Sequence, residues 1–167
     1  MDLPSFRYHP DPLASGTAFT TWSALDAVYG PQWVAAARGQ GLIAQGGTSS
    51  VLARMESGER PVGVILLENL LLKPDSPARA ILPSDGAVAV AGPVAIPRGC
   101  PDLHAAERFV AWLMTEPAQA AIVAGGMHSP LPGAPAPAGA PPLEQIQLFP
   151  TPSDLDAAAF KARWVGP

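Results

Sequence analysis

Two short segments rich in glycine and hydroxyl side chains are the clearest candidates for binding chemistry in this sequence. They are Ser15-Gly16-Thr17 and Gly47-Thr48-Ser49, and each stands directly before an apolar pattern with helical spacing. The first turn of a helix has unpaired backbone N–H groups and the positive end of the helix dipole. Two such starts close together would suit phosphate, carboxylate or another small anion. The structural alternative is that these residues only form turns and cap their helices.

A carboxylate and an amide could complete such a site. Glu68 and Asn69 follow the apolar segment Val62 to Leu67, which we expect to be a buried strand. Glu68 could pair with a cationic ligand or accept a hydrogen bond from a hydroxyl, and Asn69 offers both a donor and an acceptor. We therefore expect a site that holds a small polar or charged ligand without covalent chemistry, formed by Ser15, Gly16, Thr17, Gly47, Thr48, Ser49, Glu68 and Asn69.

No set of residues in the sequence indicates catalysis, a metal ion or a cofactor. His128 and Ser129 are neighbours, but adjacent residues rarely face each other and no acidic group is evident to orient the histidine. A single cysteine, Cys100, and three histidines far apart predict no zinc site. His9 and His104 are expected to be solvated or to cap helices. We expect a binding protein rather than an enzyme.

Composition excludes two further classes of function. The net charge is −4 and the ten lysines and arginines are scattered singly, so the sequence has no basic stripe for a nucleic acid. No apolar run reaches the 18 or so residues that a membrane span requires. The segment Met1-Asp2-Leu3-Pro4 lacks a basic region followed by an apolar one, so we expect no export signal within this chain.

Apolar spacing and capping residues predict a series of helices. One begins after Ser15 and runs to Tyr29, and the next begins at Pro31. Others follow Gly47, cover Ala106 to Leu113, restart at Thr115 and begin near Ser153. The four tryptophans lie on these helical patterns and are expected in the core: Trp22, Trp33, Trp112 and Trp164.

Between these helices the sequence predicts strands. The candidates are Leu42 to Ala44, Val62 to Leu67, Arg79 to Leu82 and Ala87 to Ile96. Alternating strands and helices favour an α/β layer. Gly92-Pro93 should interrupt strand pairing and could act as a hinge. Many of the 21 prolines lie between Pro130 and Pro142, which predicts an irregular linker.

Several short motifs, each present once, follow one another in a particular order along most of the chain. They are Asp11-Pro12 with Ser15-Gly16-Thr17, Tyr29-Gly30, Gly47-Thr48-Ser49, Gly58-Glu59-Arg60-Pro61-Val62-Gly63, Leu82-Pro83-Ser84-Asp85-Gly86, Pro93-Val94-Ala95-Ile96-Pro97-Arg98-Gly99, Ala105-Ala106-Glu107-Arg108-Phe109 and Thr115-Glu116-Pro117-Ala118-Gln119. This order resembles the extracellular solute-binding proteins of bacterial ABC importers, in the type II periplasmic-binding class that includes the ferric-ion-binding proteins.

The resemblance implies an α/β lobe with a central mixed sheet flanked by helices, within a fold of two lobes that close on a ligand. Residues 12–86 would form the second lobe after a lead-in at 1–11, and 87–129 would form the hinge strand and the returning helices of the first lobe. A linker at 130–142 and a C-terminal segment at 143–167 follow. The first lobe would be incomplete, as in a fragment, a truncated reading frame or a chain whose missing surface another chain covers. A bare helix face with Phe109, Trp112 and Leu113 would then favour association.

The resemblance also bears on the ligand and the partners. Ferric-binding relatives use a Tyr-Tyr pair where this sequence has Glu68-Asn69, and the only tyrosines are Tyr8 and Tyr29, so ferric iron is disfavoured. The implied partners are an ABC permease and its ATPase, with a periplasmic or extracellular location for the full-length protein. The alternatives are a ligand-sensing effector domain of a transcription regulator and, with less support, an enzyme on the same scaffold. Upstream sequence would separate import from regulation.

Overall fold

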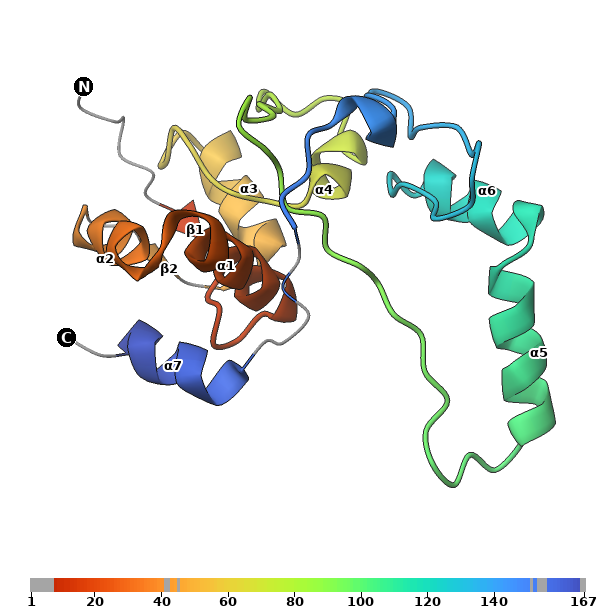
Figure 1. Ribbon diagram of the computed structural model, residues 1–167. Helices are drawn as coiled ribbons and strands as arrows, with labels where there is room; N and C mark the ends of the chain where they lie inside the picture. The colour runs from red at the N-terminus through yellow and green to blue at the C-terminus, as the bar shows by residue number, and fades with distance from the viewer. Residues whose placement is uncertain (1–7, 41–42, 45, 151, 153–155, 166–167) are drawn as a thin grey trace.

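Helices joined by long connecting segments dominate the fold. The computed structural model describes residues 8–40, 43–44, 46–150, 152 and 156–165. In chain order the helices are α1 (Gly16–Tyr29), α2 (Pro31–Gly39), α3 (Thr48–Glu56), α4 (Leu67–Leu71), α5 (Leu103–Leu113), α6 (Glu116–Ala124), the 3-10 helix η1 (Leu143–Gln145) and α7 (Ala157–Val165). Figure 1 shows α1, α2, α3 and α7 gathered together, while α5 stands apart at the end of an extended segment.

The helix boundaries follow the capping signals of the sequence. Ser15 caps α1, with its Oγ accepting a hydrogen bond of 3.3 Å from the N–H of Ala18. Gly30 ends α1 with a φ of +84°, a conformation that glycine adopts without a steric cost, and Pro31 then opens α2. Thr115 precedes α6 as predicted. Ser153 lies outside the described residues, but Asp156 caps α7 by accepting from the N–H groups of Ala158 and Ala159.

Aromatic side chains from α1 and α7 form the core together with Val34 of α2. Trp22, Phe160 and Trp164 are all buried, and the ring centroids of Trp22 and Trp164 lie 5.0 Å apart. Arg163 of α7 pairs with Asp26 of α1 at 2.7 Å on the rim of this contact. Trp22 and Trp164 therefore occupy the core as predicted. Trp33 and Trp112 do not, with exposed fractions of 41% and 49%.

The strands are much shorter than the sequence predicts. Within the described part of the chain they are β1 (Tyr8–His9) and β2 (Ile43–Ala44), which pair in parallel, with one further bridge between Ala87 and Leu148. The prediction of a central mixed sheet flanked by helices is wrong.

The reason is visible in the segments that were expected to be strands. Leu67 begins α4, so the apolar run from Val62 enters a helix at its end. Ile81, in the expected strand Arg79 to Leu82, has an exposed fraction of 84%. Residues 88–96 are extended but form neither helix nor strand. A strand needs a neighbouring strand to pair its backbone groups, and a local apolar pattern does not supply one.

Two segments connect the α1, α2, α3 and α7 group to α5 and α6, and they lie side by side. The chain leaves at Ala87, whose N–H donates to the carbonyl of Gln147 at 2.8 Å. It returns at Phe149, whose N–H donates to the carbonyl of Ala87 at 2.9 Å. The crossing of the green and blue segments marks this place in Figure 1. Ala87 and Leu148 therefore pair where the two connecting segments cross.

The proline-rich segment 130–142 contains no helix or strand, as its composition predicts. It nevertheless packs against its surroundings. Pro137 is fully buried, and His128 Nε2 lies 3.0 Å from the carbonyl of Pro141. The Cβ position of Gly139 would lie 3.2 Å from Leu71 Cδ2 of α4. This segment thus follows a defined path beside α4 and α6.

Candidate functional site

The two glycine- and hydroxyl-rich helix starts lie at the same edge of the small sheet. β1 and β2 are parallel, with Tyr8 opposite Ile43 and His9 opposite Ala44. Each strand is followed by a short loop and a helix, α1 in one case and α3 in the other. The two parallel strands therefore place the N-termini of α1 and α3 at the same edge of the sheet, where both strands have their carboxyl ends.

A backbone hydrogen bond ties the two loops together. The N–H of Asp11 donates to the carbonyl of Gly46 at 3.1 Å. The carbonyl of Asp11 then accepts from the N–H groups of Ala14 and Ser15, at 3.1 and 2.8 Å. The chain that precedes α1 is thus held against the chain that precedes α3. This contact joins the loops that lead into the sequence motifs at residues 15–17 and 47–49.

At the start of α1 the side chains mainly serve the helix. Ser15 Oγ caps it, so the structural reading of this hydroxyl is correct. Asp11 Oδ1 accepts from the N–H of Leu13 at 2.8 Å. Gly16 is the first helical residue and is exposed, and Thr17 is half-buried. The free donors at this start are backbone N–H groups of the first turn.

The hydroxyl groups at the start of α3 do not cap this helix. Gly47 occupies the N-cap position with φ −100°, and no side chain accepts a hydrogen bond from the first turn of the helix. Ser50 Oγ donates back to the carbonyl of Gly47 at 2.8 Å. Ser49 is exposed and Thr48 is half-buried. A ligand at this edge would meet uncapped N–H groups and two hydroxyls.

Glu68 and Asn69 lie on α4 rather than at the end of a strand. The segment before α4 runs back along α3, since Arg60 N–H donates to Arg54 O and Gly63 packs against Val51. The Cβ position of Gly126 would lie 3.1 Å from Glu68 Cβ, so the turn after α6 covers this part of α4. Among the described residues, no hydrogen bond joins Glu68 or Asn69 to either helix start.

Asn69 carries an unusual buried atom. Its Oδ1 is inaccessible to solvent and has no hydrogen-bond partner among the described residues. A buried amide oxygen without a partner costs free energy, so such a group calls for a specific explanation. The same holds for His9 Nε2 and Ser23 Oγ in the core.

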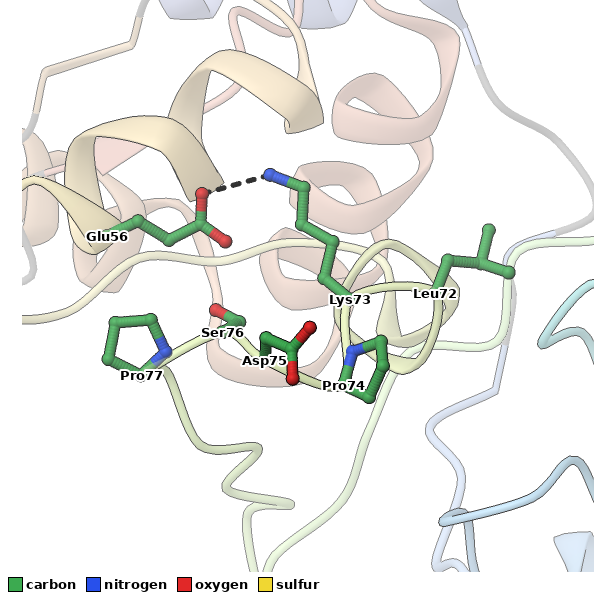
Figure 2. A pocket seen from close by; sticks show the side chains of 7 residues that line it. All are labelled: Glu56, Leu72, Lys73, Pro74, Asp75, Ser76 and Pro77. Carbon is green, nitrogen blue, oxygen red and sulfur yellow. Dashed lines mark hydrogen bonds and ion pairs between the residues drawn. The ribbon is translucent and has the colours of Figure 1, made fainter.

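An open hollow lies at the other end of α3. It has a volume of about 400 Å³ and is lined by Glu56, Leu72, Lys73, Pro74, Asp75, Ser76 and Pro77. Figure 2 shows Lys73 reaching across it to Glu56, with 2.9 Å between Nζ and Oε2. The hydrogen bond from Lys73 holds the pKa of Glu56 below its ordinary value, and Ser76 acts in the same direction.

This hollow is separate from the helix starts. Glu56 is the last residue of α3 and Thr48 is the first, eight residues earlier. At 1.5 Å per residue the two lie about 12 Å apart along the helix axis. No sequence motif predicts this hollow. The only signal was the turn composition of Lys73-Pro74-Asp75-Ser76-Pro77, which does not indicate a ligand.

The described residues contain no group of three or more histidine, cysteine, aspartate or glutamate side chains that could hold a metal ion. His128 and Ser129 do not face each other as a catalytic pair would. Ser129 Oγ donates to Gln119 Oε1 at 2.8 Å, and His128 Nε2 faces the carbonyl of Pro141. None of the helices in the described ranges is both long enough and apolar enough to cross a bilayer.

The sequence also matches a known protein family. The family model for bacterial extracellular solute-binding proteins matches residues 9–128. This chain belongs to that family.

The match begins at His9 of β1 and ends at His128 after α6, so it includes both helix starts, α4 and the segment that carries α5. For an extracellular solute-binding protein, a small-molecule ligand and a periplasmic or extracellular location follow from membership. Neither a curated protein nor a solved structure matches this solute-binding chain.

Proposed function

We propose that this solute-binding protein is the ligand-capturing component of an ABC importer, of the type II periplasmic-binding class. Its partners are a membrane permease and an ATPase, and it catalyses no reaction. One observation supports the proposed position of the ligand site. Two helix N-termini meet at the carboxyl edge of β1 and β2, tied together by the bond from Asp11 N–H to Gly46 O.

The ligand that suits this edge is a small anion, such as a phosphate, an organophosphate or a carboxylate. Backbone N–H groups in the first turns of α1 and α3 donate, and both helix dipoles favour negative charge. The hydroxyls of Thr17, Thr48 and Ser49 add donors of adjustable direction. In this proposal, closure brings Glu68 and Asn69 of α4 to the ligand, where they orient its polar groups.

Ferric iron remains disfavoured as the cargo. Of the two tyrosines in the sequence, Tyr29 donates its hydroxyl hydrogen bond to Asp85 at the surface, far along α1 from Gly16. Closure is assigned to bending between Ala87 and Gly92, next to the bridge from Ala87 to Leu148.

The test removes single N–H groups while keeping each helix. Gly16 and Thr48 are first helical residues, a position where proline is tolerated, and Ser15 already has the extended backbone that proline requires before it. Gly16→Pro and Thr48→Pro each delete one donor. Gly16→Ala and Thr48→Ala are the matched controls, because they keep the N–H, and a Cβ at Gly16 meets nothing within 4 Å.

Binding is measured by isothermal titration with inorganic phosphate, a phosphonate and a dicarboxylate. A hydrogen bond to a charged ligand contributes about 1.5–3 kcal/mol, so each proline variant should raise Kd roughly 10- to 100-fold. The Gly16→Ala control should bind normally. If an anion bound to both proline variants as tightly as to the wild-type protein, the helix starts would be excluded as its site.

A further inference from the structure

His9 of β1 is a buried histidine to which the proposed function gives no role. Its exposed fraction is 1%, and its Nε2 is inaccessible to solvent and has no hydrogen-bond partner among the described residues. Trp22 of α1 lies against it, with 4.8 Å between the ring centroids. Histidine is the side chain that gains a charge most readily below neutral pH, so a buried one can act as a pH-sensitive switch.

The other ring nitrogen of His9 has two neighbours of opposite kinds. Trp22 Nε1, which can only donate, lies 2.8 Å from Nδ1. The carbonyl oxygen of Pro10, which can only accept, lies 2.6 Å from the same atom. Nδ1 has one position in the plane of the ring, which holds either a lone pair or a proton. It therefore bonds to Trp22 when unprotonated and to Pro10 when protonated, but not to both.

The carbonyl of Pro10 belongs to a peptide group that also holds the loop before α1 against the loop before α3. The N–H of this group is that of Asp11, which donates to the carbonyl of Gly46 at 3.1 Å. The peptide is trans, so the group is planar and its C=O and N–H point in opposite directions. One rigid unit thus contacts His9 on one side and the loop before α3 on the other.

We propose that protonation of His9 moves the hydrogen bond of Nδ1 from Trp22 to Pro10. The same step strengthens the bond from Asp11 N–H to Gly46 O. A protonated ring makes a charge-assisted bond to the carbonyl. Such a bond polarises the peptide group, so its N–H becomes a stronger donor. Acid therefore tightens the contact between the two loops and loosens the contact between β1 and α1.

The titration of His9 agrees with this exchange of partners. Burial lowers the pKa of His9 to about 4, and the hydrogen bond to the Pro10 carbonyl acts in the opposite direction. An accepting carbonyl has this effect because it stabilises the protonated ring. The ring therefore bonds to Trp22 near neutral pH and changes partner as the pH falls toward 4.

The ionisable groups on the elements around His9 are neutral or have partners of their own. The phenols of Tyr8 on β1 and Tyr29 on α1 are neutral in this pH range, and β2 has no ionisable residue. Asp11 Oδ1 accepts from a backbone N–H in its own loop, and Asp26 of α1 pairs with Arg163. The two ionisable residues of α3, which packs against β1, form the ion pairs Arg54 with Glu59 and Glu56 with Lys73.

Nuclear magnetic resonance on the 15N-labelled full chain, titrated from pH 7.5 to 3.5, tests the proposal. The ring nitrogens report the protonation of His9, the indole N–H of Trp22 reports its bond to Nδ1, and the amide of Asp11 reports the contact between the loops. On acidification we expect the indole proton of Trp22 to move upfield and the amide proton of Asp11 to move downfield. Both changes should have the same midpoint as the titration of His9.

Three results would overturn the proposal. The first is an Nδ1 that already carries its proton at pH 7.5, and the second is an Asp11 amide that does not follow the titration of His9. The third is unfolding of the chain before the ring is protonated, because the protonated state would then not belong to the folded protein. The titration uses no ligand, so the switch and the proposed anion site can fail separately.

Trp22→Phe separates the two partners of Nδ1. It removes the N–H but keeps an aromatic ring in the core, so His9 should accept a proton more easily. We expect the midpoint of His9 to rise by about one pH unit, which corresponds to one net hydrogen bond, while the Asp11 amide still follows it. Trp33→Phe is the matched control, because Trp33 is exposed and stacks on Tyr29. Equal midpoints in the two variants would overturn the role of Trp22.

Discussion

Trp22 Nε1 donates a hydrogen bond of 2.8 Å to Nδ1 of His9, and both side chains are buried. This bond requires an unprotonated Nδ1. The histidine ring lies 4.8 Å from the tryptophan ring, at the point where β1 joins the core. His9 was expected to be solvated or to cap a helix, which is wrong. Its exposed fraction is 1%.

Acid should therefore destabilise this protein through His9. Burial lowers the pKa of His9 to about 4, although the nearby carbonyl of Pro10 acts in the opposite direction. The unfolded state binds the proton near pH 6.5, so stability is complete above that pH and is lost as the pH falls toward 4. We expect a loss of about 3 kcal/mol across this window. Urea unfolding at pH 7.5, 6.0, 5.0 and 4.0 measures it.

His104 provides the control for this pH dependence. It is exposed near the start of α5, so His104→Gln should leave the profile unchanged. His9→Phe should flatten the profile between pH 6.5 and 5, above the range in which carboxylates titrate. A wild-type free energy of unfolding that stays constant between pH 6.5 and 5 would contradict the role of His9.

A second prediction concerns Tyr29 at the crossing of the two connecting segments. Its hydroxyl donates to Asp85, and the pKa of Tyr29 is raised, first by this hydrogen bond and then by desolvation and the carboxylate charge. Tyr29 also stacks on Trp33 and meets Phe149 edge-on, with centroids 4.9 and 5.8 Å apart. Ionising the phenol would place two negative charges side by side.

Absorbance titration of the phenolate isolates this effect in a Tyr8→Phe background, which leaves Tyr29 as the only tyrosine. The phenol should titrate above the ordinary pKa of about 10. Asp85→Asn should bring it back toward that value, whereas Asp75→Asn, in the hollow beside Lys73, should not. Equal titration curves with and without Asp85 would show that the two side chains are apart in solution.

The helices of this chain could be predicted from the sequence because their signals are local. Ser15, Pro31 and Thr115 set the starts of α1, α2 and α6 through interactions within a few residues. The core positions of Phe160 and Trp164 also follow from spacing within α7. These features depend on one turn of helix and on little else.

β2 (Ile43–Ala44) falls within the predicted strand Leu42 to Ala44, but the pairing of the strands could not be predicted because it depends on distant parts of the chain. β1 lies in a proline-rich stretch without any alternating pattern, and its partner β2 comes 35 residues later. Ala87 finds its bridge only at Leu148. The neighbourhood of the two helix starts likewise arises from one long-range bond, between Asp11 and Gly46. The motifs indicated the residues at the two helix starts, but not that β1 and β2 hold these two starts together or that Glu68 and Asn69 lie on α4.

A substitution at Gly46 measures how much the loop before α3 contributes to the free energy of unfolding. Its φ is +69°, a region that costs other residues roughly 1–2 kcal/mol, and an added Cβ would collide with Ser50 Oγ. Gly46→Ala should lower the free energy of unfolding by at least that amount, as measured by urea denaturation. Gly47→Ala is the matched control, because its φ is −100° and a Cβ there meets nothing within 4 Å.

The two contributions at Gly46 can be separated by a second substitution. Ser50→Ala removes the hydroxyl with which the new Cβ collides, so the Gly46→Ala, Ser50→Ala double variant should recover the steric part and keep the backbone part. Relative to Ser50→Ala alone, which accounts for the lost hydrogen bond from Ser50 Oγ to Gly47 O, the remaining deficit should be close to the roughly 1–2 kcal/mol of the left-handed conformation. If Gly46→Ala and Gly47→Ala were equally stable, the loop before α3 would not have the left-handed turn that brings Gly46 O to Asp11.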